Sequence, residues 1–88
     1  MDASERRERA WRKTCAALSN DPNIVEEMRR EGIILPSEPD ADLVDRICDV
    51  LLTVLVTFGL DPDSEANAYG RQIDDLIGMV NSFRLWDT

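Results

Sequence analysis

The chain has 88 residues, a formal net charge of −8 at pH 7 and no histidine. It therefore has room for one domain and lacks the residue on which most general bases, catalytic triads and zinc sites depend. Its two cysteines are too few for a disulfide framework, its charged start differs from a secretory signal, and its longest apolar run is shorter than the about 20 residues that span a bilayer. We expect one cytoplasmic, all-helical domain over residues 1–88, with residues 1–9 frayed or ordered by a partner.

The charge is unevenly distributed along the sequence. Residues 1–30 hold seven basic and six acidic side chains, whereas residues 31–88 hold three basic and twelve acidic side chains. An acidic body repels nucleic acid and anionic membranes, and it attracts basic proteins. Solubility alone is the simpler explanation of the same charge. The sequence leaves both explanations open.

The first predicted helix spans residues 3–19. Asp2 lies three residues before Glu5, as in a capping box, although Ser4 is a rival cap. Apolar residues recur at helical spacing and predict one inward stripe, made of Ala10, Trp11, Cys15 and Leu18.

The second predicted helix is short. It begins at Asp21-Pro22, where a carboxylate can accept from the free amides of the first turn and the proline loses no hydrogen bond. Gly32 predicts its end. The apolar segment 33–36 that follows cannot be helical, because Pro36 and Pro39 favour extended backbone before them. We expect an extended strap laid against the helices.

The third predicted helix runs from Asp40 or Ala41 to Phe58 and ends at Gly59. Residues 50–56 are apolar on nearly every side, and a helix of that kind must be covered on every side. Three small neighbours cover it poorly, so we expect a homodimer or an obligate partner. The predicted interface consists of Val50, Val54, Phe58, Tyr69, Gly70 and Phe83.

The fourth predicted helix begins at Asp61-Pro62, which repeats the start of the second, and ends near Arg84. Gly70 and Gly78 each cost about 1 kcal/mol relative to alanine inside a helix. Such glycines indicate close approach of another backbone or local flexibility. Together the four segments predict an all-α, compact, four-helix bundle-like domain with a short second helix.

Without histidine, the one catalytic arrangement that the sequence still allows is a set of carboxylates on facing helices. The acids concerned are Glu26, Glu27, Glu31, Asp45 and Asp49, the last two before an apolar run that ends in Gly-Leu-Asp. Over residues 24–62 this pattern is similar to that of helical pyrophosphohydrolases, which hold magnesium between Glu/Asp pairs. The family's spacing requires acids where Arg30 and Arg46 stand, so two of its four ligands are missing. We therefore predict no enzyme, metal or cofactor, and keep a degenerate magnesium-dependent nucleotide pyrophosphohydrolase as an alternative.

A second alternative is a DNA-binding accessory protein. The basic residues that would grip phosphates are Arg6, Arg7, Arg9, Arg12 and Lys13. Glu5 and Glu8 lie four residues before Arg9 and Arg12, where they pair within the helix. The segment lacks helix-turn-helix spacing and interleaved aromatic residues, so nucleic-acid binding is not the leading hypothesis.

The leading hypothesis is a small protein-interaction module, such as an adaptor, an inhibitor, or an antitoxin-like or immunity-like protein. Acidic residues on the third and fourth helices would face a basic partner, and two tryptophans would anchor it. The predicted partner-binding residues are Asp42, Asp45, Asp49, Asp74, Asp75, Trp11 and Trp86. The tryptophans serve equally well as caps on a small core.

Overall fold

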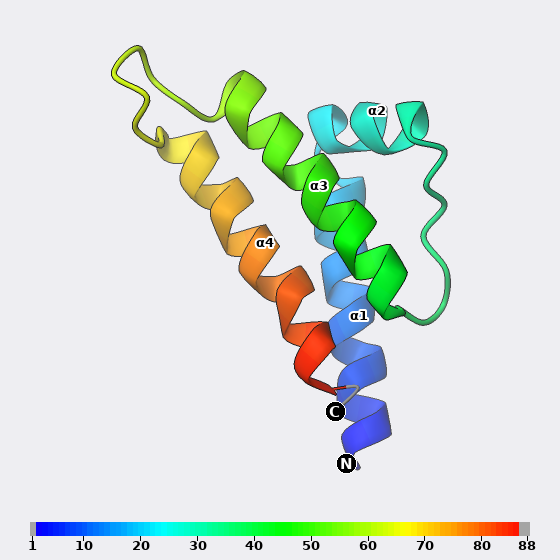
Figure 1. Cartoon of the computed structure of the whole chain (residues 1–88). Helices are drawn as coiled ribbons and strands as arrows, with labels where there is room; N and C mark the ends of the chain where they lie inside the picture. Colours follow the sequence, from blue (N-terminus) through cyan, green and yellow to red (C-terminus); the bar gives the residue numbers. More distant parts are fainter. Residues whose placement is uncertain (1, 87–88) are drawn as a thin grey trace.

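The computed structural model describes residues 2–86 of the chain, and side chains as far as Arg84. It contains four helices: α1 (Ala3–Ser19), α2 (Pro22–Arg30), α3 (Ala41–Phe58) and α4 (Ala68–Trp86). The predicted all-α class is therefore confirmed. α3 and α4 lie antiparallel along the length of the molecule, α1 runs beside them, and the short α2 crosses one end (Figure 1). No helix in the described part has the length and apolar character needed to cross a bilayer.

Three of the helix starts follow from the aspartate before each of them. The carboxylate of Asp2 accepts from the amide of Glu5 at 2.9 Å, so Asp2 and not Ser4 is the N-cap of α1. Asp21 accepts from the second and third residues after it, at 2.9 and 3.2 Å. Asp40 accepts from the Leu43 amide at 2.8 Å. Each carboxylate satisfies an amide that has no partner within its own helix.

The end of α2 and the strap after it also match the sequence. Gly32 has a φ of +69°, and the amide of Ile33 donates to the carbonyl of Met28 at 2.9 Å. This is the glycine-terminated closure expected of a helix that ends at Gly32. In the strap, Ile33 is buried, Ile34 points outward and Leu35 is partly buried. The strap is therefore extended and packs through alternate side chains.

The start of the fourth helix was predicted wrongly. α4 begins at Ala68 and not at Pro62. The Asp61 carboxylate accepts from the amides of Asp63 and Glu65, both at 3.0 Å, and Ser64 has a left-handed φ of +66°. These bonds, with an isolated bridge between Leu60 and Ala66, close a tight loop that cannot continue as helix. The cap of α4 is Asn67, whose side-chain oxygen accepts from the Gly70 amide at 2.8 Å.

The core lies among the four helices and includes Ile33 of the strap. Trp11 of α1 is 1% exposed, and its ring meets Phe83 of α4 edge to face with centroids 5.2 Å apart. The indole N–H donates to the carbonyl of Pro36 in the strap at 3.0 Å. This bond satisfies a donor that would otherwise be buried without a partner.

Within this chain α3 is covered incompletely, as expected of three small neighbours, and cover by a second copy or a partner stays a prediction. Val50, Leu51 and Val54 are buried, but Leu52 is 48% exposed and Val56 is 67% exposed. The reason is geometric: α4 and α2 contact α3 on its inner sides, and one face of the helix is exposed among the described residues.

Candidate functional site

The uncovered face of α3 carries its acidic side chains. Asp42, Asp45 and Asp49 are all exposed, and their spacing of three and four residues places them on one side of the helix. Farther along, the same side carries Leu52, Thr53 and Val56, which are also exposed. We call these six residues the outer face of α3. It is acidic in its first half and largely apolar in its second.

Two of the three aspartates have no cationic partner among the described side chains. Asp45 forms an ion pair with Arg84 of α4. Arg46 is the basic residue nearest to the aspartates in sequence, but its guanidinium donates to the backbone carbonyl of Glu31 at 2.9 Å. Across residues 2–84, whose side chains are described, Asp42 and Asp49 form no ion pair. Their charges are left for solvent or a partner.

The hydroxyl groups of two threonines of α3 are bonded within the helix. The hydroxyl of Thr53 donates to the carbonyl of Asp49 at 3.0 Å, and that of Thr57 donates to the carbonyl of Thr53 at 2.7 Å. Because each hydroxyl hydrogen is bound to its own helix, these side chains have less need of other polar partners.

One flank of α4 borders the outer face. Cys48 of α3 donates through its thiol to the side-chain oxygen of Asn81, 3.4 Å away, and burial raises the pKa of this thiol. Asp74 lies two helical turns before Asn81, so it lies on the same side of α4. Gly78 stands between them, and a Cβ added there would meet no heavy atom within 4 Å. The predicted close backbone approach is therefore present at Gly70 but not at Gly78.

Asp75 does not join this acidic surface. It lines a separate depression between α1 and α4, together with Asp21 and Gln72. Asp21 is already hydrogen-bonded within the fold, because its carboxylate accepts from the hydroxyl of Tyr69 at 2.6 Å. Burial, with this bond next in importance, raises the pKa of Tyr69. Of the five predicted acidic residues, the structure thus places three on the outer face of α3 and Asp74 on the neighbouring flank of α4, and it separates Asp75.

The predicted aromatic anchors and interface residues lie mostly inside the molecule. Trp11 is a core residue and is unavailable to a partner in this fold, whereas the side chain of Trp86 lies outside the described residues. Four of the six predicted interface residues are also interior to a single chain: Val50, Val54, Gly70 and Phe83. Tyr69 is half-buried and bonded to Asp21. Phe58 is half exposed, at the end of α3. A dimer of this fold would have to use side chains other than these four buried residues, and dimerisation stays a prediction.

The carboxylates of the pyrophosphohydrolase-like pattern meet partly in space. Glu27, Glu31 and Asp49 line a cavity of about 230 Å³ between α2 and α3, and Arg46 lines it as well. Arg30, at the other departing position, pairs with Glu26 and Glu27. No three acidic or cysteine side chains in the described part are grouped so that they could hold a metal ion. The arginines thus occupy ligand positions, and the enzyme alternative remains untested.

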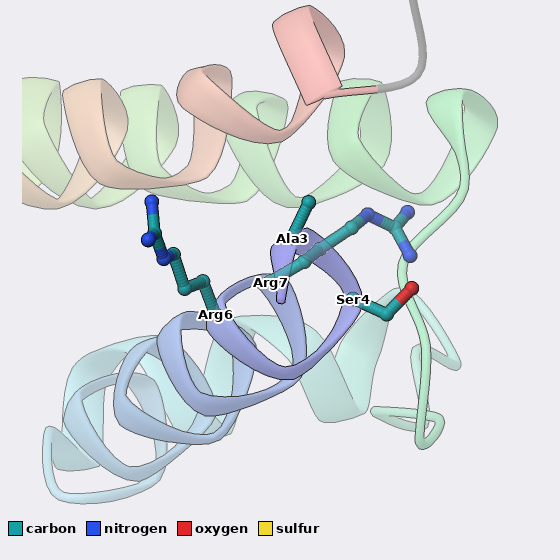
Figure 2. A pocket seen from close by; sticks show the side chains of 4 residues that line it. All are labelled: Ala3, Ser4, Arg6 and Arg7. Carbon is teal, nitrogen blue, oxygen red and sulfur yellow. The ribbon is translucent and has the colours of Figure 1, made fainter. Parts of the chain in front are cut away.

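The basic residues of α1 are divided among several contacts. A depression of about 470 Å³ is lined by Ala3, Ser4, Arg6 and Arg7, on the first turns of α1 beside the end of α4 (Figure 2). Arg7 donates to the carbonyl of Pro39 at 3.0 Å, and Arg12 pairs with Glu8. The Arg7 bond ties the first turns of α1 to the segment before α3, whereas the Arg12–Glu8 pair lies within α1. Nucleic-acid binding by this segment stays a prediction.

No protein-family model matches the sequence, and no match was found among curated proteins or among solved structures. Sequence reasoning found the three aspartates but missed the exposure of Leu52 and Val56. A usable signal was present: Leu52 follows Asp45 by seven residues and Val56 follows Asp49 by seven, so both continue the acidic side of the helix.

Proposed function

We propose that this chain is a small binding module whose acidic outer face of α3 docks a basic protein. The observation that carries the proposal is the exposure of Asp42 and Asp49 without a cationic partner among the described residues. Arg46, which could neutralise them, donates instead to the carbonyl of Glu31, the residue after α2. The charges of Asp42 and Asp49 give the acidic half of the outer face a local negative potential.

A surface of this kind acts mainly on encounter and specificity. Exposed charges steer an oppositely charged partner and reject acidic competitors, and they add little to affinity one at a time. Because the carboxylates are in water, salt screens them over about 8–10 Å at physiological ionic strength. The complex should therefore weaken as salt rises.

The test compares two variants that each remove two negative charges. Asp42→Asn with Asp49→Asn alters the outer face, and Glu38→Gln with Asp75→Asn alters exposed positions elsewhere. A basic protein captured from the native host at low salt should bind the outer-face variant about three- to tenfold more weakly, as two exposed charge pairs predict. It should bind the control variant as it binds the unaltered chain. Equal affinity of both variants would refute the proposal.

A further inference from the structure

We infer that the partner docks on α3 as a basic amphipathic helix, whose apolar residues cover Leu52 and Val56 and whose basic residues face Asp42 and Asp49. This inference rests on the proposed function and specifies the segment that the surface accepts. The starting observation is that the acidic and apolar halves lie in line on one helix. Leu52 is 48% exposed and Val56 is 67% exposed, although each continues the stripe that the aspartates begin.

The length of the outer face sets the length of the partner segment. Asp42 and Val56 are 14 positions apart, which is about 21 Å along a helix at 1.5 Å per residue. A partner helix of about four turns, or about 14 residues, would span the surface. An extended segment of that reach would need fewer residues, but it would leave its backbone amides and carbonyls unpaired against the apolar half.

The edge toward α4 has room for such a helix. α3 and α4 are antiparallel, with Cys48 bonded to Asn81 and Gly59 in contact with Gly70. Leu52 is therefore level with residues 77–78. Gly78 has no side chain, and the space around its absent Cβ is open. Because Gly78 has no side chain, α4 projects least at the level of Leu52. A partner side chain can therefore lie beside Leu52 and over Gly78.

Charge argues against a second copy of this chain as the occupant. With two outer faces parallel, the three aspartates of one copy would meet those of the other. With the faces antiparallel about Val56, Asp49 of one copy would approach the 61–66 loop of the other, where Asp63 and Glu65 are exposed. If the two faces were antiparallel and crossed at Asp49, Asp42 of one copy would face Val56 of the other. Like charges, or charges against apolar groups, disfavour all three arrangements.

The chain's own basic helix is also unsuitable as the occupant. α1 carries exposed Arg9, Arg12 and Lys13, but its apolar residues Trp11 and Leu18 are buried in the core. A folded second copy could present the basic residues of its α1 to the outer face, but not the apolar residues of that helix. Those apolar residues would become available only if the second copy unfolded. A basic helix from a different protein satisfies both halves of the surface.

The test uses two synthetic peptides of 14 residues with identical composition. In the striped peptide, leucines and lysines lie on one helical face, with the leucines at one end; in the scrambled peptide they are spread around the helix. The striped peptide should bind at least about tenfold more tightly in a fluorescence anisotropy titration, because it alone buries both apolar side chains. Equal affinity of the two peptides, or no binding of either, would overturn the inference.

Variants of the protein separate this inference from the proposed function. Leu52→Gln with Val56→Gln changes only exposed side chains, and its melting curve reports that the fold is retained. It should reduce striped-peptide affinity about tenfold, to the level of the scrambled peptide. If it leaves both affinities unchanged while Asp42→Asn with Asp49→Asn weakens host-protein binding, the inference fails and the proposed function stands. Sedimentation that shows a dimer dispersed by the glutamine variant would overturn the inference in favour of a second copy.

Discussion

Gly70 of α4 lies directly against Gly59 at the end of α3. A Cβ added to Gly70 would be 2.1 Å from the carbonyl oxygen of Gly59, and a Cβ added to Gly59 would be 2.8 Å from the Cα of Gly70. Neither neighbour is the flexible end of a side chain, so the two helices can meet at this point only with glycine at both positions.

Replacement of Gly70 by alanine should therefore destabilise the fold, by about 1–3 kcal/mol as in other overpacked sites. Gly78 provides the matched control, because its surroundings are open. Gly78→Ala should stabilise the protein by up to about 1 kcal/mol, the helix propensity difference between the two residues. Urea unfolding of both variants measures the two effects. A stabilised Gly70→Ala protein would contradict the observed contact.

Asn67 should contribute to stability as the N-cap of α4. Its side-chain oxygen accepts from the Gly70 amide, and its side-chain nitrogen donates to the carbonyl of Phe58 at 3.2 Å. Asn67→Ala should cost about 1–2 kcal/mol, as the loss of a helix cap does. Asp63→Ala in the same loop should cost less, since the bonds to Asp61 use the backbone amide of Asp63. Equal losses in thermal unfolding would favour a helix start within the loop.

Trp11 should act on stability and not on binding. Trp11→Phe removes the bond from the indole to the Pro36 carbonyl and leaves space beside Phe83. We expect a loss of about 1–3 kcal/mol, because the carbonyl loses its donor and the core its contacts. Affinity for a basic partner, measured where the variant is fully folded, should be unchanged. A stable variant that no longer binds would return Trp11 to the role of a surface anchor.

Tyr69 should make stability decline at alkaline pH. Its pKa is raised by burial and by the bond to Asp21, so the folded state favours the neutral hydroxyl. The resulting stabilisation is complete below the unfolded pKa of about 10. It is lost as the pH rises through the higher folded pKa, because the folded state must then hold a phenolate. Tyr69→Phe should be less stable at pH 7, with a smaller difference at pH 11 in chemical unfolding. A constant difference would contradict this.

Local chemistry explains which parts of the fold the sequence could predict. Asp21-Pro22 and Gly32 define α2 through bonds that span only a few residues, so no knowledge of packing was needed. Asp61-Pro62 has the same letters but a different outcome, because the left-handed Ser64 and the bridge from Leu60 to Ala66 turn the chain back. Neither Leu60 nor Ala66 has a local sequence signal that predicts this pairing.

The candidate site was predictable to the extent that it depends on helix periodicity. The spacing of Asp42, Asp45 and Asp49 placed them on one side of α3 without a structure. The exposure of Val56 depends instead on which sides of α3 its neighbours occupy, and that is a property of tertiary packing. The sequence predicted that the helices of one chain would cover residues 50–56 poorly, but it did not predict that Leu52 and Val56 would be the exposed residues.

Amide chemical shifts give the most direct test of binding at the outer face of α3. The striped basic peptide would be titrated into isotope-labelled protein and followed in ¹H–¹⁵N correlation spectra. The account predicts that the largest shifts cluster at Asp42, Asp49, Leu52 and Val56, with small changes around Asp75 and Glu38. Shifts concentrated on α1 or around Asp75, with residues 42–56 unmoved, would contradict it.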